Sequence, residues 1–271
     1  MKEEIIVISG INFGQYIPEN SYLHQMDPRT KIIVTMSGVI AAISLQTTIE
    51  LVVLLGINIV LIILSKVPIT TYLKGLKPFI IIIAIMFLIQ AFFTPGEPVI
   101  NIYLENINIS KEGITFAYIL SIKLIIIILF ALLLTTTTSS MSLTYGLEKI
   151  LNPLKRLGMP VHEIIMIMTI ALRFLPMLSE ESQRIIQVQN ARGTDFKTKN
   201  IYKRVKNLLA IITPLTINAF RRAETLAEAM ESRAYTGGQG RTRLNEPNMT
   251  KLDYTVIALI IFMWIVLLLL R

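Results

Sequence analysis

Long apolar stretches alternate with short polar segments along much of the chain. Five stretches predict transmembrane spans, at residues 32–45, 51–64, 79–93, 114–134 and 254–270. The first two are shorter than the roughly 20 residues that cross a bilayer, so each must tilt or extend into its flanks. A polar turn, QTTIE at 46–50, separates them. The pattern predicts an all-α integral membrane protein with about five transmembrane helices.

The pattern changes after residue 138, where apolar residues recur at helical spacing. Steps of three, four or seven predict two long amphipathic helices, at about 161–190 and 200–232. The most apolar part, 164–178, contains Arg173, and an arginine at the centre of a span costs roughly 2.5–3.5 kcal/mol to insert. We therefore expect these helices to pack on each other at the membrane surface or under it.

The chain is thus predicted to have three parts. They are an N-terminal segment with the first four spans at 1–138, a domain of long amphipathic helices at 139–251, and the last span at 252–271. Pro176 and Pro214 fall inside the two amphipathic helices, where each removes a backbone hydrogen bond. Both are candidates for helix bends, as movable hinges or as fixed kinks.

Charge supports membrane insertion and sets the predicted orientation. The 271 residues are 53% hydrophobic and only 16% charged, against about 25% charged in soluble domains. Residues 139–251 hold 17 Lys/Arg and 9 Asp/Glu, and so carry the whole net charge of +8. The loop 65–78 is basic, whereas the loop 94–113 is acidic. The positive-inside rule then predicts a multi-pass cell-membrane protein, with the N-terminus and 139–251 in the cytoplasm and the C-terminus outside.

The sequence lacks the residues that several kinds of functional site require. No cysteine is present, which excludes disulfides and thiolate metal sites, and no Gly-Lys pair is present, which excludes a Walker A phosphate loop. The two histidines, His24 and His162, have no ligand-like spacing. We therefore expect neither a catalytic site nor a metal or other cofactor. Aromatic residues are scattered through the basic region, so its expected contacts are with membrane lipid and not with nucleic acid.

Lys123 lies near the middle of the span 114–134, where charge is expensive. It either snorkels or pairs with a backbone carbonyl, or it belongs to a proton or substrate relay. A relay would suit a stand-alone secondary transporter, but it would need an acidic partner inside the membrane. Glu50 falls in a turn and Asp253 at the end of a span, so this alternative is the weaker one.

Two short motifs close the amphipathic helices. Each places an arginine between small residues: Ala191-Arg192-Gly193 in QNARGTDF (189–196) and Ser232-Arg233-Ala234 in ESRAYTGG (231–238). A cation at a helix C-terminus gains about 0.3–1 kcal/mol from the helix dipole, and a following glycine stops the helix. Such capping does not need small residues on both sides of the arginine, whereas insertion into a partner's groove does. The duplication therefore predicts docking to a pair of homologous subunits.

A membrane enzyme acting on lipid is a further alternative. Arg192 and Arg233 would then bind phosphate, as arginine does readily. The enzyme would also need a general base nearby, and Asp195 and Glu231 are the close candidates.

Three segments together resemble the transmembrane (T) component of energy-coupling-factor (ECF) transporters, the EcfT family. They are NSYLHQMDPRTK at 20–31, GLEKILNPLKRLGMPVHEIIMIMTIALRFLPMLSEESQRIIQVQNARGTDF at 146–196, and FRRAETLAEAMESRAY at 220–235. The family belongs to ABC-type importers of vitamins and transition metals. At Ala234 this chain departs from the glycine that is commoner in the second motif.

The resemblance implies roles for both motifs and for the partners. The motifs around Arg192 and Arg233 would end coupling helices that dock into grooves on two homologous ATPase subunits, which bind the ATP. The chain itself would hydrolyse nothing. It would transmit the motion of the ATPases to a separate substrate-binding S component, for uptake of vitamins or other micronutrients. Because the S component determines the cargo, this chain does not name it.

Overall fold

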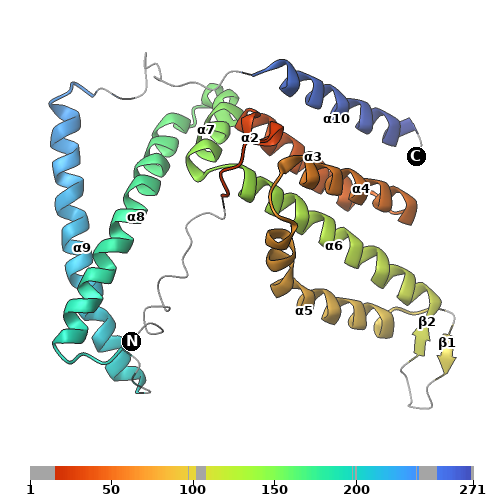
Figure 1. Cartoon of the computed structure of the whole chain (residues 1–271), viewed down its shortest axis with the longest axis horizontal. Helices are drawn as coiled ribbons and strands as arrows, with labels where there is room; N and C mark the ends of the chain where they lie inside the picture. The colour runs from red at the N-terminus through yellow and green to blue at the C-terminus, as the bar shows by residue number, and fades with distance from the viewer. Residues whose placement is uncertain are drawn as a thin grey trace. The chain divides into compact units, whose positions relative to one another are not determined.

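The computed structural model describes residues 16–96, 98–101, 108–196, 198, 200–235, 237 and 249–269. This part of the chain is almost entirely helical (Figure 1). The helices are α2 (Tyr22–Gln25), α3 (Pro28–Ser44), α4 (Thr48–Ser65), α5 (Ile69–Phe93), α6 (Lys111–Thr137), α7 (Ser140–Leu151), the 3-10 helix η1 (Asn152–Leu157), α8 (Val161–Ala191), α9 (Ile201–Glu231) and α10 (Lys251–Leu269). The predicted all-α membrane fold is confirmed.

One small element was not predicted. The antiparallel strands β1 (Pro98–Asn101) and β2 (Asn108–Ser110) pair between α5 and α6, in the segment predicted to be an acidic loop. Strands this short carry almost no period-2 signal, so the sequence pattern could not reveal them.

The helices form two compact units. One contains α2 to α7 with α10, and the other contains η1, α8 and α9. We call the first the membrane unit and the second, after the role expected from the sequence, the coupling unit. They divide the chain at 150/151 and 245/246, whereas the predicted parts meet at 138/139 and 251/252. α7 groups with the preceding helices because Gly146 lies directly against Pro28 of α3. The three-part organisation of function remains a prediction.

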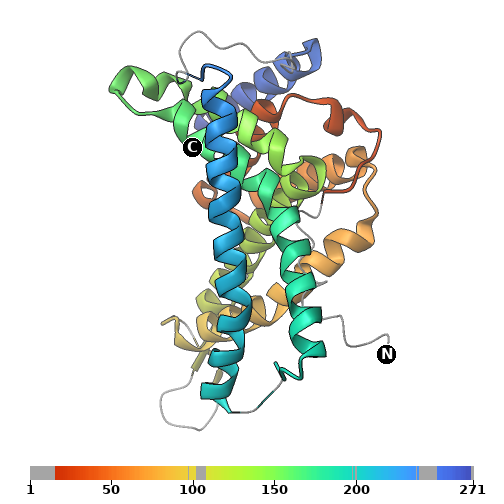
Figure 2. The ribbon, with the colours of Figure 1, turned by 90° about the vertical axis from the view of Figure 1, so that its left-hand side faces the viewer.

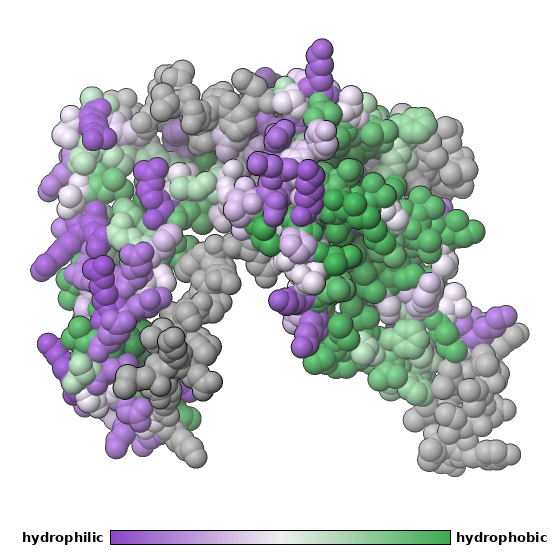
Figure 3. Space-filling view, viewed as in Figure 1, coloured by the Kyte–Doolittle hydropathy of each residue, from purple (hydrophilic) through white to green (hydrophobic). Residues whose placement is uncertain are grey.

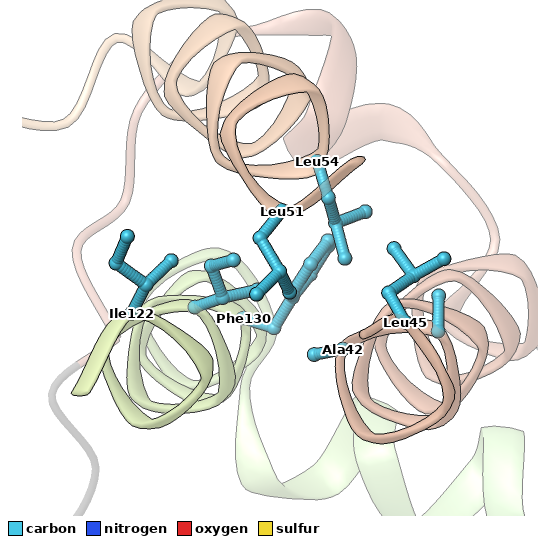
Figure 4. Close-up of a cluster of buried hydrophobic side chains, with 8 residues drawn as sticks. Ala42, Leu45, Leu51, Leu54, Ile122 and Phe130 are labelled. Atoms are coloured by element: carbon cyan, nitrogen blue, oxygen red, sulfur yellow. The ribbon is translucent and has the colours of Figure 1, made fainter. Parts of the chain in front are cut away.

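α6 is the central helix of the membrane unit and packs along α3, α4 and α5. The approach to α3 is close, since a Cβ added at Gly38 would collide with the ring of Phe130. Leu51 of α4 and Ile122 of α6 complete a buried cluster with Ala42 of α3 (Figure 4). Small residues thus allow the helix backbones to approach each other, as is typical of helices packed in membranes.

Four of the described helices are long and apolar enough to cross a membrane, namely α4, α5, α6 and α8. The first three contain the predicted spans 51–64, 79–93 and 114–134. The predicted span 32–45 corresponds to α3, which has 17 residues and is short for a full crossing. α8 was expected at the surface because of Arg173, yet its length and composition also allow it to span.

Two surfaces differ in polarity. In the membrane unit, hydrophobic side chains gather over α4 to α6, whereas hydrophilic side chains are frequent on α8 and α9 of the coupling unit (Figure 3). α5 begins at Ile69 and contains Pro78, so Lys74 and Lys77 lie on a helix and not in the predicted loop 65–78. Proline weakens a helix without always ending it, and α5 therefore extends beyond the apolar run of the predicted span 79–93.

Side-chain caps begin α3 and α10. The Asp27 carboxylate accepts a hydrogen bond from the Arg29 N–H at 2.8 Å, and Pro28 is the first residue of α3. At the start of α10, the Thr250 N–H and hydroxyl both donate to Asp253 at 2.8 Å. These contacts satisfy backbone N–H groups at the starts of the two helices.

Candidate functional site

α8 and α9 lie side by side and antiparallel (Figure 2). Three side-chain hydrogen bonds mark the pairing: Tyr235 with Met166 (2.9 Å), Asn218 with Glu181 (3.3 Å), and Asn207 with the Asp195 carbonyl (2.6 Å). From one contact to the next, the residue number of the α9 partner falls while that of the α8 partner rises. Arg192 and Arg233 therefore lie at opposite ends of the helix pair. Each helix has 31 residues, which corresponds to a length of about 46 Å.

The first end is built by a backbone turn around Gly193. Its φ of 86° is left-handed, and its N–H donates to the Asn190 carbonyl at 2.9 Å. The next N–H, from Thr194, donates back to the Gln189 carbonyl at 3.0 Å. This pair of bonds is the Schellman motif that closes many helices. It places Arg192 at the last position before the left-handed residue.

The second end repeats this turn around Ala234. Its φ of 54° is also left-handed, and its N–H donates to the Glu231 carbonyl at 2.9 Å. The following N–H, from Tyr235, donates to the Met230 carbonyl at 3.0 Å. Arg233 thus has the same place in its turn as Arg192 has in the first. Alanine forms the turn without the glycine, although an L-residue in this conformation costs roughly 1–2 kcal/mol.

Both arginines are available to a partner. All six motif residues are exposed: Ala191, Arg192, Gly193, Ser232, Arg233 and Ala234. In the described part of the chain, neither guanidinium takes part in a hydrogen bond or an ion pair. The helix-end carbonyls are instead met by backbone N–H groups, so neither arginine side chain is needed as a cap.

The hollow between the two long helices has no titratable side chain in the lining that the structure describes. This hollow of about 380 Å³ lies between α8 and α9, and its lining is apolar except for Thr216. Asp195 and Glu231, the general-base candidates, are exposed at opposite ends of the pair. The structure therefore does not bring them together. Pro176 and Pro214 lie inside α8 and α9 as predicted, and their role as bends remains a prediction.

Lys123 pairs with a backbone carbonyl, which is the simpler of its two interpretations. Its ammonium donates to the carbonyl of Ile43 at 3.1 Å, at the C-terminal end of α3. Those last carbonyls have no partner within their own helix. The contact confirms the pairing with a backbone carbonyl.

Sequence reasoning missed a second lysine of this kind, Lys31. It is buried, and its Nζ donates to the carbonyls of His24 at 3.1 Å and Thr137 at 3.0 Å. Beside it, the Asp27 N–H donates to the Asp253 carboxylate at 3.0 Å. These bonds join the start of α3 to the end of α6 and the start of α10. The only sequence signal for Lys31 was the DPRTK segment, and this segment does not reveal which distant residues Lys31 contacts.

His24 belongs to the same corner of the membrane unit. Burial lowers the pKa of its imidazole below the usual 6.5, more than the hydrogen bond with the Ile17 carbonyl raises it. The ring is therefore neutral at pH 7. Among the described residues, no three His, Asp or Glu side chains gather as a metal site would require.

Comparison with known proteins places the chain in a family. The family described as "Cobalt transport protein" matches residues 19–244. The chain is 40% identical to the energy-coupling factor transporter transmembrane protein EcfT of Acidaminococcus fermentans over 247 residues, 91% of each chain. It is 41% identical to EcfT of Ruminiclostridium cellulolyticum, over 96% of this chain and 98% of the relative.

A third relative, EcfT of Bacillus subtilis, is 39% identical over 95% of this chain and 97% of its own length. The family match over residues 19–244 includes both arginine motifs. The chain therefore belongs to the EcfT family of energy-coupling factor transporter transmembrane proteins.

Proposed function

We propose that this chain is the coupling subunit of an ECF-type importer. Its two arginine-bearing helix ends dock on two homologous ATPase subunits, and its helices pass their motion to a substrate-binding S component that takes up a vitamin or another micronutrient. One observation carries the proposal. Arg192 and Arg233 occupy the same position in two matched helix-end turns, both exposed and both without a partner in the described chain.

The geometry suits docking into two separate grooves. The arginines terminate helices that are about 46 Å long and antiparallel, so a single small site cannot hold both. Arginine presents a rigid fork of five donors to carboxylates or carbonyls. Small neighbours on each side leave room for a groove to close around the guanidinium. ATP is bound by the partners, and this chain holds no cofactor.

The S component requires a second surface, and α9 offers one. Its apolar residues are largely uncovered within the chain, including Val205, Leu209 and Ile212, which are each about half exposed. No described residue of α9 is buried. Exposed apolar surface on this scale indicates contact with a protein partner or with lipid. We assign it to the S component and the adjoining lipid, with the coupling unit on the cytoplasmic side of the cell membrane.

Charge reversal at both helix ends tests the proposal. Arg192→Glu with Arg233→Glu should abolish co-purification with the ATPase pair and ATP-dependent substrate uptake. Each single reversal should weaken both. Arg221→Glu is the matched control, because this arginine is exposed in the interior of α9 and should leave assembly intact. Undiminished assembly and uptake in the double variant would refute the proposal.

The stand-alone transporter makes the opposite prediction. It requires uptake into liposomes by this chain alone, without ATPases and without ATP. Lys123 in the span is already paired with a backbone carbonyl, which removes the residue that a relay would have used. We therefore expect no uptake by the isolated chain.

A further inference from the structure

A small apolar cavity lies among five helices of the membrane unit. Its volume is about 160 Å³, and its walls come from α2, α3, α4, α6 and α10. Leucine, valine and methionine side chains form most of the lining, with the Lys31 side chain on one wall. Apolar cavities of about this size remain dry and accept hydrocarbon groups. A hydrocarbon chain is therefore the kind of group that fits it.

The cavity lies at one end of the membrane unit. Leu64 is in the last turn of α4, Leu134 is in the last turn of α6, and Leu252 is in the first turn of α10. In the orientation proposed above, all three of these helix ends face the cytoplasm. The cavity is then level with the inner leaflet of the membrane, where lipid acyl chains begin.

Two exposed lysines lie close in sequence to residues that line the cavity. Leu64 and Leu252 line it and are 45% and 48% exposed, so they mark its open side. Lys66 lies just after Leu64, at the C-cap of α4, and Lys251 lies just before Leu252, at the start of α10. Both lysines are exposed. The nearby Asp253 is buried and already accepts hydrogen bonds from backbone N–H groups. An apolar cavity with two exposed lysines next in sequence to its lining has the chemistry that an anionic amphiphile requires.

We propose that this cavity binds one acyl chain of an anionic phospholipid of the cytoplasmic leaflet, with the lipid phosphate between Lys66 and Lys251. Each lysine near an anionic lipid surface strengthens binding by about fivefold. The inference uses the proposed orientation, but it does not depend on docking to the ATPases. Lipid binding can therefore be measured on the isolated chain, and failure of one proposal is distinguishable from failure of the other.

The experiment uses the full chain in nanodiscs of equimolar phosphatidylglycerol and phosphatidylcholine. After transfer into mild detergent, native mass spectrometry counts the retained lipids. We expect one phosphatidylglycerol per chain, retained in preference to phosphatidylcholine. Lys66→Gln with Lys251→Gln should lower this preference by tenfold or more. The matched control, Lys74→Gln with Lys77→Gln, removes two exposed charges from α5 and should leave the preference unchanged.

A cavity-filling variant tests the acyl-chain contact separately. Val256 lines the cavity and is partly buried, so Val256→Phe should reduce retention of both lipids at least fivefold in chains that keep their thermal unfolding midpoint. Should this variant fail to fold, the charge variants still decide the question. Equal retention of the two lipids by the wild type, or an equal effect of the two lysine pairs, would overturn the proposal.

Discussion

Ala234 adopts a left-handed backbone conformation that glycine usually occupies. Its φ of 54° matches the left-handed turn at Gly193, and both turns make the same two backbone bonds. An alanine there is strained, whereas glycine is not. The second helix end therefore keeps the position of Arg233 at some cost in local stability.

Ala234→Gly should consequently stabilise the end of α9 by about 0.5–1 kcal/mol, because relief of strain exceeds the added entropy of the unfolded chain. The Tyr235 N–H, which donates to Met230, reports on this turn. Its hydrogen exchange should slow by about two- to fivefold. The control Ala227→Gly, at an exposed position inside α9, should destabilise the helix by about 1 kcal/mol. Faster exchange at Tyr235 in the Ala234 variant would contradict the strain argument.

The two lysines that contact helix-end carbonyls differ in what their removal leaves behind. Lys31→Met leaves the carbonyls of His24 and Thr137 without a donor in a buried site, and each unpaired group costs about 1–3 kcal/mol. Lys123→Met loses one bond but also removes a charge from a span, which offsets the loss. Thermal unfolding in detergent should show a large loss of stability for Lys31→Met. For Lys123→Met, the stability should change by no more than about 1 kcal/mol. Equal losses of stability in the two variants would contradict the argument that burial makes the Lys31 contacts more costly to lose.

At the scale of elements, the close packing of α3 against α6 depends on a missing side chain. Gly38→Ala would place a Cβ against the Phe130 ring, and overpacking of this kind costs about 1–3 kcal/mol. Phe130→Leu in the same chain should restore part of the loss. Gly56→Ala serves as control, since nothing lies within 4 Å of its added Cβ, and better helix propensity should stabilise α4 slightly. Unfolding midpoints of these variants measure the effect, and additivity of Gly38→Ala and Phe130→Leu would contradict a direct contact.

The sequence predicted some elements far better than others. The bounds of α8 and α9 agree with 161–190 and 200–232 to within one residue, because a long helix repeats its apolar period many times. α5 begins before the predicted span 79–93, because its first turns, with Lys74 and Lys77, lie outside the apolar run on which the prediction rested. The hairpin β1–β2 was missed because it is too short to show a period.

At the scale of the whole molecule, the sequence could single out candidate site residues but not the contacts that place them. Arg192 and Arg233 were identified from duplication and small neighbours alone. Their place at opposite ends of an antiparallel pair comes from contacts such as Asn218 with Glu181, which join positions far apart in sequence. The same holds for Lys31 and Thr137. Local patterns do not encode such contacts.

The central claim is that the two arginine-bearing ends dock on two different ATPase subunits. The chain contains no cysteine, so Thr194→Cys and Ser232→Cys each supply a unique thiol beside one arginine. Thr225→Cys, exposed on α9, is the control.

The most direct measurement is cross-linking of each thiol to the assembled complex, followed by identification of the attached subunit. We expect the thiol at 194 to attach to one ATPase, the thiol at 232 to attach to the other, and the thiol at 225 to attach to neither. Attachment of both end thiols to the same ATPase, or to none, would contradict this account of how the chain couples its partners.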